Sequence, residues 1–218
     1  MNGRDVESTT RLAYRESPIV YVVRHGETPQ YKAKQFRGFE DDSLDDVGRK
    51  QIEQARNDLQ DVDFDAALSS DLRRTMETIE ILLDGRPRPE IQRLVEMRPL
   101  NVGKFEGLPK TSHWMGVLKT YLDNPDTPIP GGASLNWFRS RYRAFFDRAI
   151  HLAMHANNPH LWVQHATTNH ELGHILYDDI DALDVSPGGI IGIWTTPQGL
   201  YAKALAGAAV RGSGYAYS

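Results

Sequence analysis

The stretch IVYVVRHGET, residues 19–28, decides the fold, because an apolar run passes without a break into charged and hydroxyl-bearing residues. The run IVYVV is β-branched or aromatic throughout and stands between Pro18 and Gly26, which is typical of a buried strand. Arg24 and His25 then follow at the carboxyl end of that strand. Because sites in open α/β sheets lie outside the carboxyl ends of the strands, this stretch predicts both a strand and a site.

Outward from this strand, short apolar runs alternate with segments of helical spacing. The apolar runs predict further strands over 64–68, 161–164, 189–194 and 200–204. Apolar residues at helical spacing predict helices over 44–59, 72–83, 135–152 and about 168–177, with another near 112–122. Alternation of strands and helices favours an α/β domain. We therefore expect a three-layer α/β/α sandwich with a mostly parallel central sheet.

The chain divides into one expected domain and two expected tails. Residues 18–205 carry the strands and form the single domain, in which the proline-rich segment at about 84–130 acts as a cover. Residues 1–17 contain acidic side chains and no apolar run, so we expect a flexible N-terminal tail rather than a signal peptide. The small, polar residues 206–218 are expected to form a flexible C-terminal tail. A cytoplasmic location is expected, since no segment reaches transmembrane length.

Composition narrows the classes of function. The chain has 218 residues and no cysteine, which excludes disulfide scaffolds, thiol nucleophiles, iron–sulfur clusters and cysteine-based zinc sites. Its formal net charge is −4, whereas proteins that bind nucleic acid or anionic membranes need a basic surface. We therefore expect neither as a partner. Histidine is left as the natural side chain to carry a group covalently.

Polar side chains follow three of the expected strands at their carboxyl ends. The first strand leads into Arg24 and His25, the second into residues 69–74, and the third into Gln164 and His165. If these strands are parallel neighbours, two imidazoles and at least two guanidiniums meet in one crevice. Arginine forks bind phosphate oxygens bidentately, and an imidazole can attack phosphorus and become phosphorylated. The pattern therefore predicts a phosphate site.

The residues at these strand ends form an ordered set that resembles a known family. Arg24-His25-Gly26-Glu27-Thr28 resembles the signature of the histidine phosphatase superfamily, also called the phosphoglycerate mutase-like family. The register of residues 70–74 resembles the second-arginine helix of that family and selects Arg74. His165 falls where the family places its second histidine. Further matches, which extend the resemblance over roughly 19–205, are Gly38, Asp41, Leu44, Gly48, Gly103, 105–107, 130–132, Ser134 and 186–189.

The resemblance implies a role for each residue of the site. His25 is the expected nucleophile, and His165 is expected to donate hydrogen bonds to the transferring phosphoryl group. Arg24 and Arg74 are expected to clamp the phosphoryl oxygens, with Arg37 as a third member. The expected substrate-binding positions are Gly26, Glu27, Thr28, Arg37 and Ala166.

Two assignments stay open at this stage. Helical geometry places Arg74 opposite the apolar stripe of its helix, so Arg73 is the alternative for the second arginine. The family's general acid falls four residues before its mid-chain glycine, which in this chain is Pro99, a residue that cannot donate a proton. We prefer Glu96 as the acid, and Glu106 is the alternative.

A phosphoric monoester hydrolase is the function that these residues favour. The resemblance implies a phosphohistidine intermediate, no metal and no cofactor, with a small phosphorylated compound as substrate, and a homodimer is compatible with the sequence. A phosphoglycerate-mutase-type phosphotransferase uses the same intermediate and is one alternative. A catalytically impaired phosphate-ester-binding module is another. Residues 97–130, with His113, Trp114 and Tyr121, are expected to cover the pocket and select the leaving group.

A third alternative comes from residues 170–174, which read His-Glu-Leu-Gly-His. This matches the H-E-x-x-H pattern, in which two histidines one helical turn apart bind zinc and the glutamate is the base. No histidine or glutamate follows His174, so the usual third ligand is missing from the sequence pattern. We expect His170 and His174 to face solvent, because they lie opposite Leu172 on the helix.

Overall fold

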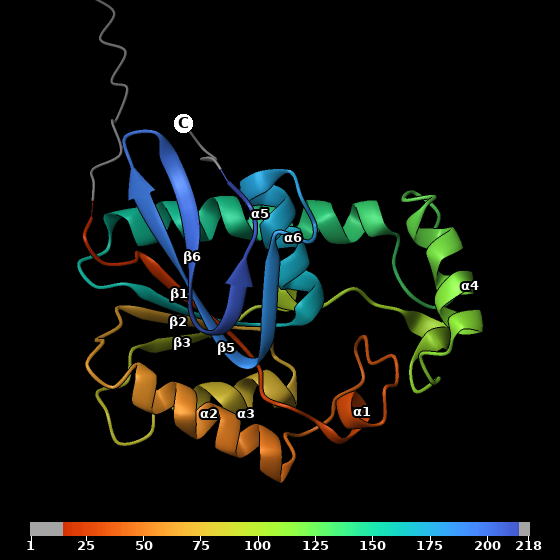
Figure 1. Cartoon of the computed structure of the whole chain (residues 1–218), viewed down its shortest axis with the longest axis horizontal. Coiled ribbons are helices and arrows are strands. Elements are labelled where there is room, and N and C mark those ends of the chain that lie inside the picture. The colour runs from red at the N-terminus through yellow and green to blue at the C-terminus, as the bar shows by residue number, and fades with distance from the viewer. Residues whose placement is uncertain (1–14, 214–218) are drawn as a thin grey trace, which may run out of the picture.

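A computed structural model describes residues 15–213, whose strands form one six-stranded sheet in the order β3-β2-β4-β1-β5-β6 (Figure 1). The strands are β1 (Val20–Arg24), β2 (Ala66–Ser69), β3 (Glu90–Arg93), β4 (His160–Gln164), β5 (Leu183–Thr196) and β6 (Gly199–Val210). The β3–β2, β2–β4 and β4–β1 pairs are parallel, whereas β1–β5 and β5–β6 are antiparallel. The expected mostly parallel sheet is therefore confirmed.

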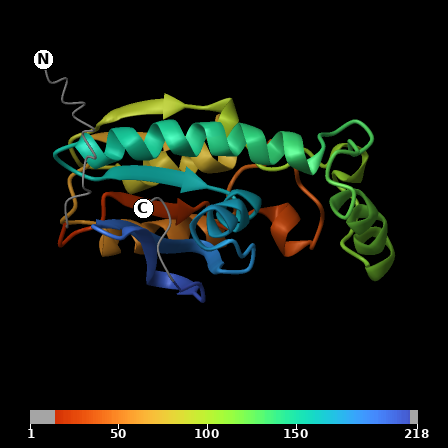
Figure 2. The ribbon, with the colours of Figure 1, turned by 90° about the horizontal axis from the view of Figure 1, so that it is seen from above.

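Helices cover both faces of this sheet (Figures 1 and 2). They are α2 (Asp46–Asp58) and α3 (Arg73–Leu82) on one face, and α5 (Leu135–His155) and α6 (Ala166–Tyr177) on the other. Successive side chains of a strand point to opposite faces. Val22 and Trp162 accordingly pack in the α5–α6 core, while Val23 and Val163 pack in the α2–α3 core. The three-layer α/β/α sandwich is confirmed by this arrangement.

A third apolar cluster lies beyond the sheet and forms a cover over the carboxyl ends of its parallel strands. The short elements here are α1 (Pro29–Lys32), the 3₁₀ turns Val95–Met97 and Gly103–Phe105, and α4 (Ser112–Leu122). In Figure 1, α4 stands apart from the sheet at the right of the molecule. Phe36 and Phe105 pack with Leu118 of α4 in this cluster, so the cover has a core of its own.

The cover is tied to the loop that follows α1. Gln35 and Pro109 form an isolated antiparallel bridge. On either side of it, Phe36 N donates to Leu108 O at 3.0 Å and Lys110 N donates to Lys34 O at 2.8 Å. These bonds fix Lys110 beside the loop that leaves the end of β1.

The cover is smaller than expected, because part of the segment 84–130 belongs to the sheet. Residues Glu90–Arg93 form β3, which pairs in parallel with β2 at the edge of the sheet. Only Ile91 of its four residues is apolar, and none of the four is fully buried, so this segment lacks the apolar run that predicts a strand. The helix expected near 112–122 is α4.

Both expected tails are shorter than predicted within the described residues. Residues 206–210 continue β6, where backbone pairing with β5 holds a run of small side chains that lacks a strand-like pattern. At the other end, Arg15 Nη2 donates to Ala156 O at 2.8 Å and Glu16 O accepts from Trp194 Nε1 at 3.2 Å. Residues 1–14 and 214–218 of the expected tails lie outside the described residues.

Across residues 15–213, no helix combines the length and the apolar character that a membrane span requires.

Candidate active site

The two histidines meet because β1 and β4 are parallel neighbours in register. Arg24 lies opposite Gln164, so His25 and His165 leave the sheet side by side. The backbone pairing continues one residue further, since His25 N donates to Gln164 O at 3.0 Å. The two imidazole centroids lie 5.1 Å apart with their planes at 62°. The convergence expected from the strand ends therefore takes place.

His25 is buried as a neutral imidazole with one free nitrogen. Its Nδ1 lies 2.7 Å from Gly26 O, and because a carbonyl can only accept, Nδ1 carries the hydrogen. Its Nε2 is buried and finds no hydrogen-bond partner among the described residues. Burial, followed by the positive charges of Arg37, Arg74 and Arg24, holds the pKa of His25 well below its usual value. A neutral ring with an unpaired Nε2 is the form that can attack phosphorus.

Arg74, and not Arg73, is the arginine that reaches the site. Its side chain is 1% exposed, whereas Arg73 is exposed. Arg74 Nη1 pairs with Asp42 Oδ1 at 2.7 Å, Nη2 donates to Gly38 O at 3.0 Å, and Nε donates to His165 Nδ1 at 3.3 Å. A guanidinium has five N–H donors, so these bonds with one to Glu40 O leave one Nη2 donor for a ligand oxygen.

Arg37 is the less constrained arginine of the site. Its Nη1 donates to Thr28 Oγ1 at 3.3 Å, and its guanidinium lies 5.4 Å from the centroid of the Tyr31 ring. Burial and the neighbouring charge of Arg74 lower its pKa to about 10. Arg37 therefore stays protonated at neutral pH and has most of its donors free for a phosphate.

Arg24 supports the site from one side. Its Nη1 donates to Val185 O of β5 at 2.6 Å. Its guanidinium lies 5.4 Å from the centroid of the Tyr31 ring. It does not line the cavity described below. Its charge nevertheless helps to lower the pKa of His25. The expected role of Arg24 as a direct clamp on phosphoryl oxygens stays a prediction.

A chain of hydrogen bonds holds His165. Because Nδ1 accepts from Arg74, the ring hydrogen lies on Nε2, which is 2.8 Å from Ser70 Oγ. Ser70 Oγ lies 2.8 Å from Thr75 Oγ1, which donates to Leu72 O at 2.8 Å. Both ring nitrogens are thus engaged, and neither directs an N–H into the cavity as expected. Burial, followed by the charge of Arg74, lowers the pKa of His165 well below its usual value.

Of the remaining expected substrate-binding residues, only Ala166 lines the cavity. Gly26 N donates to Thr78 Oγ1 at 3.4 Å. Glu27 N donates to Gln51 Oε1 at 2.9 Å. Thr28 caps α1 through its side chain and receives the bond from Arg37. These residues shape the loop after β1 rather than the cavity wall.

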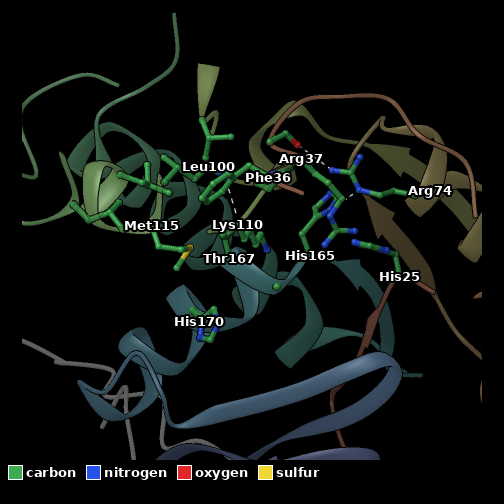
Figure 3. A pocket seen from close by; sticks show the side chains of 16 residues that line it. His25, Phe36, Arg37, Arg74, Leu100, Lys110, Met115, His165, Thr167 and His170 are labelled. Atoms are coloured by element: carbon green, nitrogen blue, oxygen red, sulfur yellow. Dashed lines mark hydrogen bonds between the residues drawn. The ribbon is translucent and has the colours of Figure 1, made fainter. Parts of the chain in front are cut away.

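The cavity at this site has a volume of about 350 Å³ and two chemically different ends (Figure 3). One end carries the cationic and imidazole side chains His25, Arg37, Arg74 and His165. Lys110 lies between them and the other end. The apolar end consists of Phe36, Leu100, Val102, Met115, Leu118 and Leu122.

Sequence reasoning missed several of these lining residues. Lys110 carries no motif, and only the pairing of its segment with the loop after α1 brings it to the cavity. Met115 and Leu118 lie one turn apart on α4, which is a signal of one helix face but not of its target. Trp114 and Tyr121, expected to cover the pocket, instead pack edge-on against Phe105, and neither they nor His113 line it.

Neither glutamate considered as the general acid lines the cavity. Glu96 points to α5, where its Oε1 lies 3.6 Å from Arg148 Nη2. The cause is local, because Met97, the next residue, is buried in the core and turns Glu96 outward. Glu106 Oε1 accepts from Phe39 N at 2.6 Å, behind the loop that carries Gly38. Burial raises the pKa of Glu106. Pro99 itself lines the cavity.

The three side chains of the H-E-x-x-H pattern point to different partners. His170 is partly exposed and lines the cavity, and its Nδ1 lies 2.9 Å from Ile180 O. Glu171 pairs with Arg139 at 3.3 Å, and His174 Nδ1 lies 3.4 Å from Asp178 Oδ1. Within residues 15–213, no group of three or more His, Asp or Glu side chains is arranged to hold a metal ion.

Known structures share this fold. The alpha-ribazole phosphatase of Shigella flexneri superposes with a TM-score of 0.72 at 19% identity, covering 91% of this chain and 98% of that one. The phosphoglycerate mutase of Bacillus anthracis superposes with a TM-score of 0.74 at 22% identity, covering 85% of this chain and 91% of that one. At these identities the likeness shows the fold alone.

Curated relatives carry names of phosphatases and mutases. Fructose-2,6-bisphosphatase TIGAR of Xenopus tropicalis is 28% identical over 170 residues, which cover 76% of this chain but only 59% of the relative. A 2,3-bisphosphoglycerate-dependent phosphoglycerate mutase of Methylocella silvestris is 31% identical over 141 residues, which cover 61% of this chain and 68% of the relative. A family model, the histidine phosphatase superfamily (branch 1), matches residues 20–187. The chain therefore belongs to the histidine phosphatase superfamily.

Proposed function

We propose that this chain is a phosphoric monoester hydrolase that carries the phosphoryl group on His25. The observation that supports this most strongly is the unpartnered Nε2 of the neutral His25, buried at the cationic end of the cavity. Arg37 and the free Nη2 donor of Arg74 are suited to hold the phosphoryl oxygens. Because these guanidiniums supply positive charge, the proposed reaction needs no metal or cofactor.

The proposed reaction has two steps. The Nε2 lone pair of His25 attacks phosphorus, the bond from phosphorus to the ester oxygen breaks, and the alcohol leaves with a proton taken up from solvent. Water then attacks the phosphohistidine and releases one proton to solvent, the phosphorus–nitrogen bond breaks, and inorganic phosphate leaves the neutral ring. The Gly26 carbonyl holds the Nδ1 hydrogen in both steps and keeps Nε2 as the attacking atom.

Hydrolysis is preferred to mutase chemistry because of the apolar end of the cavity. A mutase must retain a phosphorylated sugar acid while the phosphoryl group moves between its oxygens. Outside the cationic end, the lining side chains offer that acid few partners, since six of them are apolar. A small phosphorylated compound with an apolar body fits this cavity better.

The test is turnover of 4-nitrophenyl phosphate at acid and neutral pH, with and without a metal chelator. We expect turnover in the presence of chelator, no turnover by His25→Ala, and an added PO₃ mass on the wild-type histidine peptide after rapid acid-free quenching. Activity that needs metal and survives in His25→Ala would instead support the zinc hydrolase. Bound phosphate without any turnover would support the impaired binding module, and isomerisation of a phosphorylated sugar acid would support the mutase.

A further inference from the structure

The cavity lacks a carboxyl group that could protonate a leaving oxygen. Among the described residues, none of the 16 that line it is Asp or Glu. Pro99 forms part of the wall, and Glu96 is turned away to Arg148. Glu106 lies behind Gly38, where its Oε1 is bound by Phe39 N. Asp42 forms a buried ion pair with Arg74 and does not line the cavity.

The remaining titratable groups of the cavity are histidines and one lysine. Each ring nitrogen of His165 already has a partner. His170 lies at the opposite side of the cavity from His25 in Figure 3. Lys110 Nζ lies 5.8 Å from the centroid of the Phe36 ring and close enough to Arg37 for that charge, with burial, to lower its pKa. Lys110 is therefore the rival proton donor that an experiment must address.

The apolar end of the cavity describes the body of the substrate. Leu118 and Leu122 of α4 line this end together with Phe36 and Leu100, and Met115 of the same helix is 48% exposed at its outer edge. Such a surface stabilises an aromatic or aliphatic group by removing its apolar area from water. It offers no set of hydroxyl or carboxylate partners for a sugar.

From these two features we propose that the site acts on phosphate monoesters of apolar, acidic alcohols, phenols above all, whose oxygen departs without protonation by the protein. This inference rests on the proposed phosphohistidine hydrolase and deepens it. His25 forms the bond to phosphorus while the ester bond breaks, and the leaving phenolate keeps the electron pair and takes its proton from water. An alkyl phosphate of the same shape binds but is turned over slowly, because its alkoxide is a poor leaving group.

The test compares kcat/KM for 4-nitrophenyl, ring-substituted phenyl, phenyl and 2-phenylethyl phosphates with wild-type protein. A positioned general acid contributes about 10²–10⁴-fold, so without one we expect kcat/KM to fall at least about 100-fold from 4-nitrophenyl to 2-phenylethyl phosphate. The 2-phenylethyl ester should inhibit competitively, with an inhibition constant comparable to the KM of phenyl phosphate. A 2-phenylethyl value within about tenfold of the 4-nitrophenyl value overturns the inference.

The variant Lys110→Met distinguishes the proposal from the alternative in which Lys110 protonates the leaving group. If Lys110 protonates the leaving group, the wild-type dependence is shallow and Lys110→Met steepens it, which overturns the proposal. If the proposal holds, kcat/KM falls with the leaving group equally steeply in wild type and in Lys110→Met. If kcat/KM depends only weakly on the leaving group and a phosphohistidine is trapped, this inference is overturned but the proposed hydrolase is not. Bound inorganic phosphate with no turnover of any ester overturns the proposed hydrolase as well.

Met115→Ala tests the apolar end without disturbing the core. We expect its KM to rise about threefold more for 2-naphthyl phosphate than for phenyl phosphate, because the larger ring reaches the outer edge of the cavity. Leu152→Ala is the matched control, since Leu152 is 54% exposed on α5 and does not line the cavity. Equal KM changes for the two esters in Met115→Ala contradict the assignment of this end to the leaving group.

Discussion

At the cationic end of the cavity, His25, Arg74 and His165 are held by the sheet and by buried hydrogen bonds, whereas the side chains of the apolar end come from loops and α4. His25 and His165 follow paired strands, and Arg74 is fixed by Asp42 and two backbone carbonyls. Leu118 and Phe36 instead belong to an apolar cluster separate from the two cores of the sheet. The difference teaches that the fold fixes the geometry of the cationic end, while the apolar end can vary without disturbing it.

Substitution of Arg74 is expected to have the largest effect on activity and stability, and it tests whether the cationic end is rigidly held. In Arg74→Met, aryl phosphatase activity should fall to background, and the free energy of unfolding should decrease by about 3–5 kcal/mol, because the buried Asp42 carboxylate loses its partner. Urea unfolding and the 4-nitrophenyl phosphate assay measure the two effects.

Arg88→Met is the matched control for Arg74→Met. Arg88 pairs with Glu80 at 2.6 Å, but both side chains are about half exposed, so the loss should stay below about 1 kcal/mol. Adding Asp42→Asn to Arg74→Met should restore part of the stability and none of the activity. Equal losses of stability in Arg74→Met and Arg88→Met would show that the buried Arg74–Asp42 pair matters no more to stability than an exposed pair.

The next effect concerns the pH dependence of stability. The folded pKa values of His25 and His165 lie below the unfolded value of about 6.5, so the unfolded chain takes up protons first as the pH falls. Stability should therefore be full above about pH 6.5 and decrease below it, by up to about 1.4 kcal/mol per pH unit for each ring. Thermal unfolding from pH 8 to about pH 5 in phosphate-free buffer measures this.

The double variant His25→Gln with His165→Gln should flatten this dependence. His151→Gln is the control, because His151 is exposed and should leave the slope unchanged. A double variant that loses stability on acidification as steeply as wild type would show that other groups dominate.

A smaller effect is expected at Ser70. In Ser70→Ala the buried Nε2–H of His165 loses its acceptor, which costs about 1–3 kcal/mol, and kcat/KM should fall about tenfold as the ring becomes less fixed. Ser70→Thr should restore both values. The ¹⁵N chemical shifts of His165 report the tautomer directly, and unchanged shifts in Ser70→Ala would contradict the role of Ser70 as a positioning residue.

The smallest effect is expected at Tyr31, on the exposed side of the cationic end. Its ring contacts the guanidiniums of both Arg24 and Arg37, and each such contact is worth about 0.5–1 kcal/mol at an exposed site. Tyr31→Leu should raise KM for aryl phosphates by up to about fivefold with little change in kcat. Tyr31→Phe keeps the ring and should behave as wild type; a KM increase in Tyr31→Phe would point to the hydroxyl instead.

The cationic end could be predicted from the sequence because local patterns determine it. A buried strand followed by Arg24 and His25, and another followed by His165, need only parallel pairing to bring the imidazoles together. Arg74 was harder to assign, because its helix has an apolar stripe on the opposite side. The structure buries Arg74 as well, since the loop that carries Gly38 and Asp42 packs on that side of α3.

The other parts of the site could not be predicted, because they depend on packing and on contacts between segments that are distant in sequence. Lys110 reaches the cavity through pairing between the loops near Gln35 and Pro109, which leaves no periodic signal. The direction of Glu96 is decided by one 3₁₀ turn, in which Met97 takes the buried position. The apolar stripe of α6 through Leu172 predicts that His170 faces solvent. The first turns of α6 also border the cavity, and His170 lines it.

The contact between Gly26 and Gly48 has a consequence for how this chain can evolve. A Cβ on Gly26 would lie 2.5 Å from Gly48 O, and a Cβ on Gly48 would lie 2.1 Å from Glu27 O. Both positions therefore exclude a side chain, because each added Cβ would collide with backbone atoms of the facing segment, although only Gly26 is next to His25. In a complete substitution library selected for phosphatase activity, position 48 should tolerate as little change as position 26.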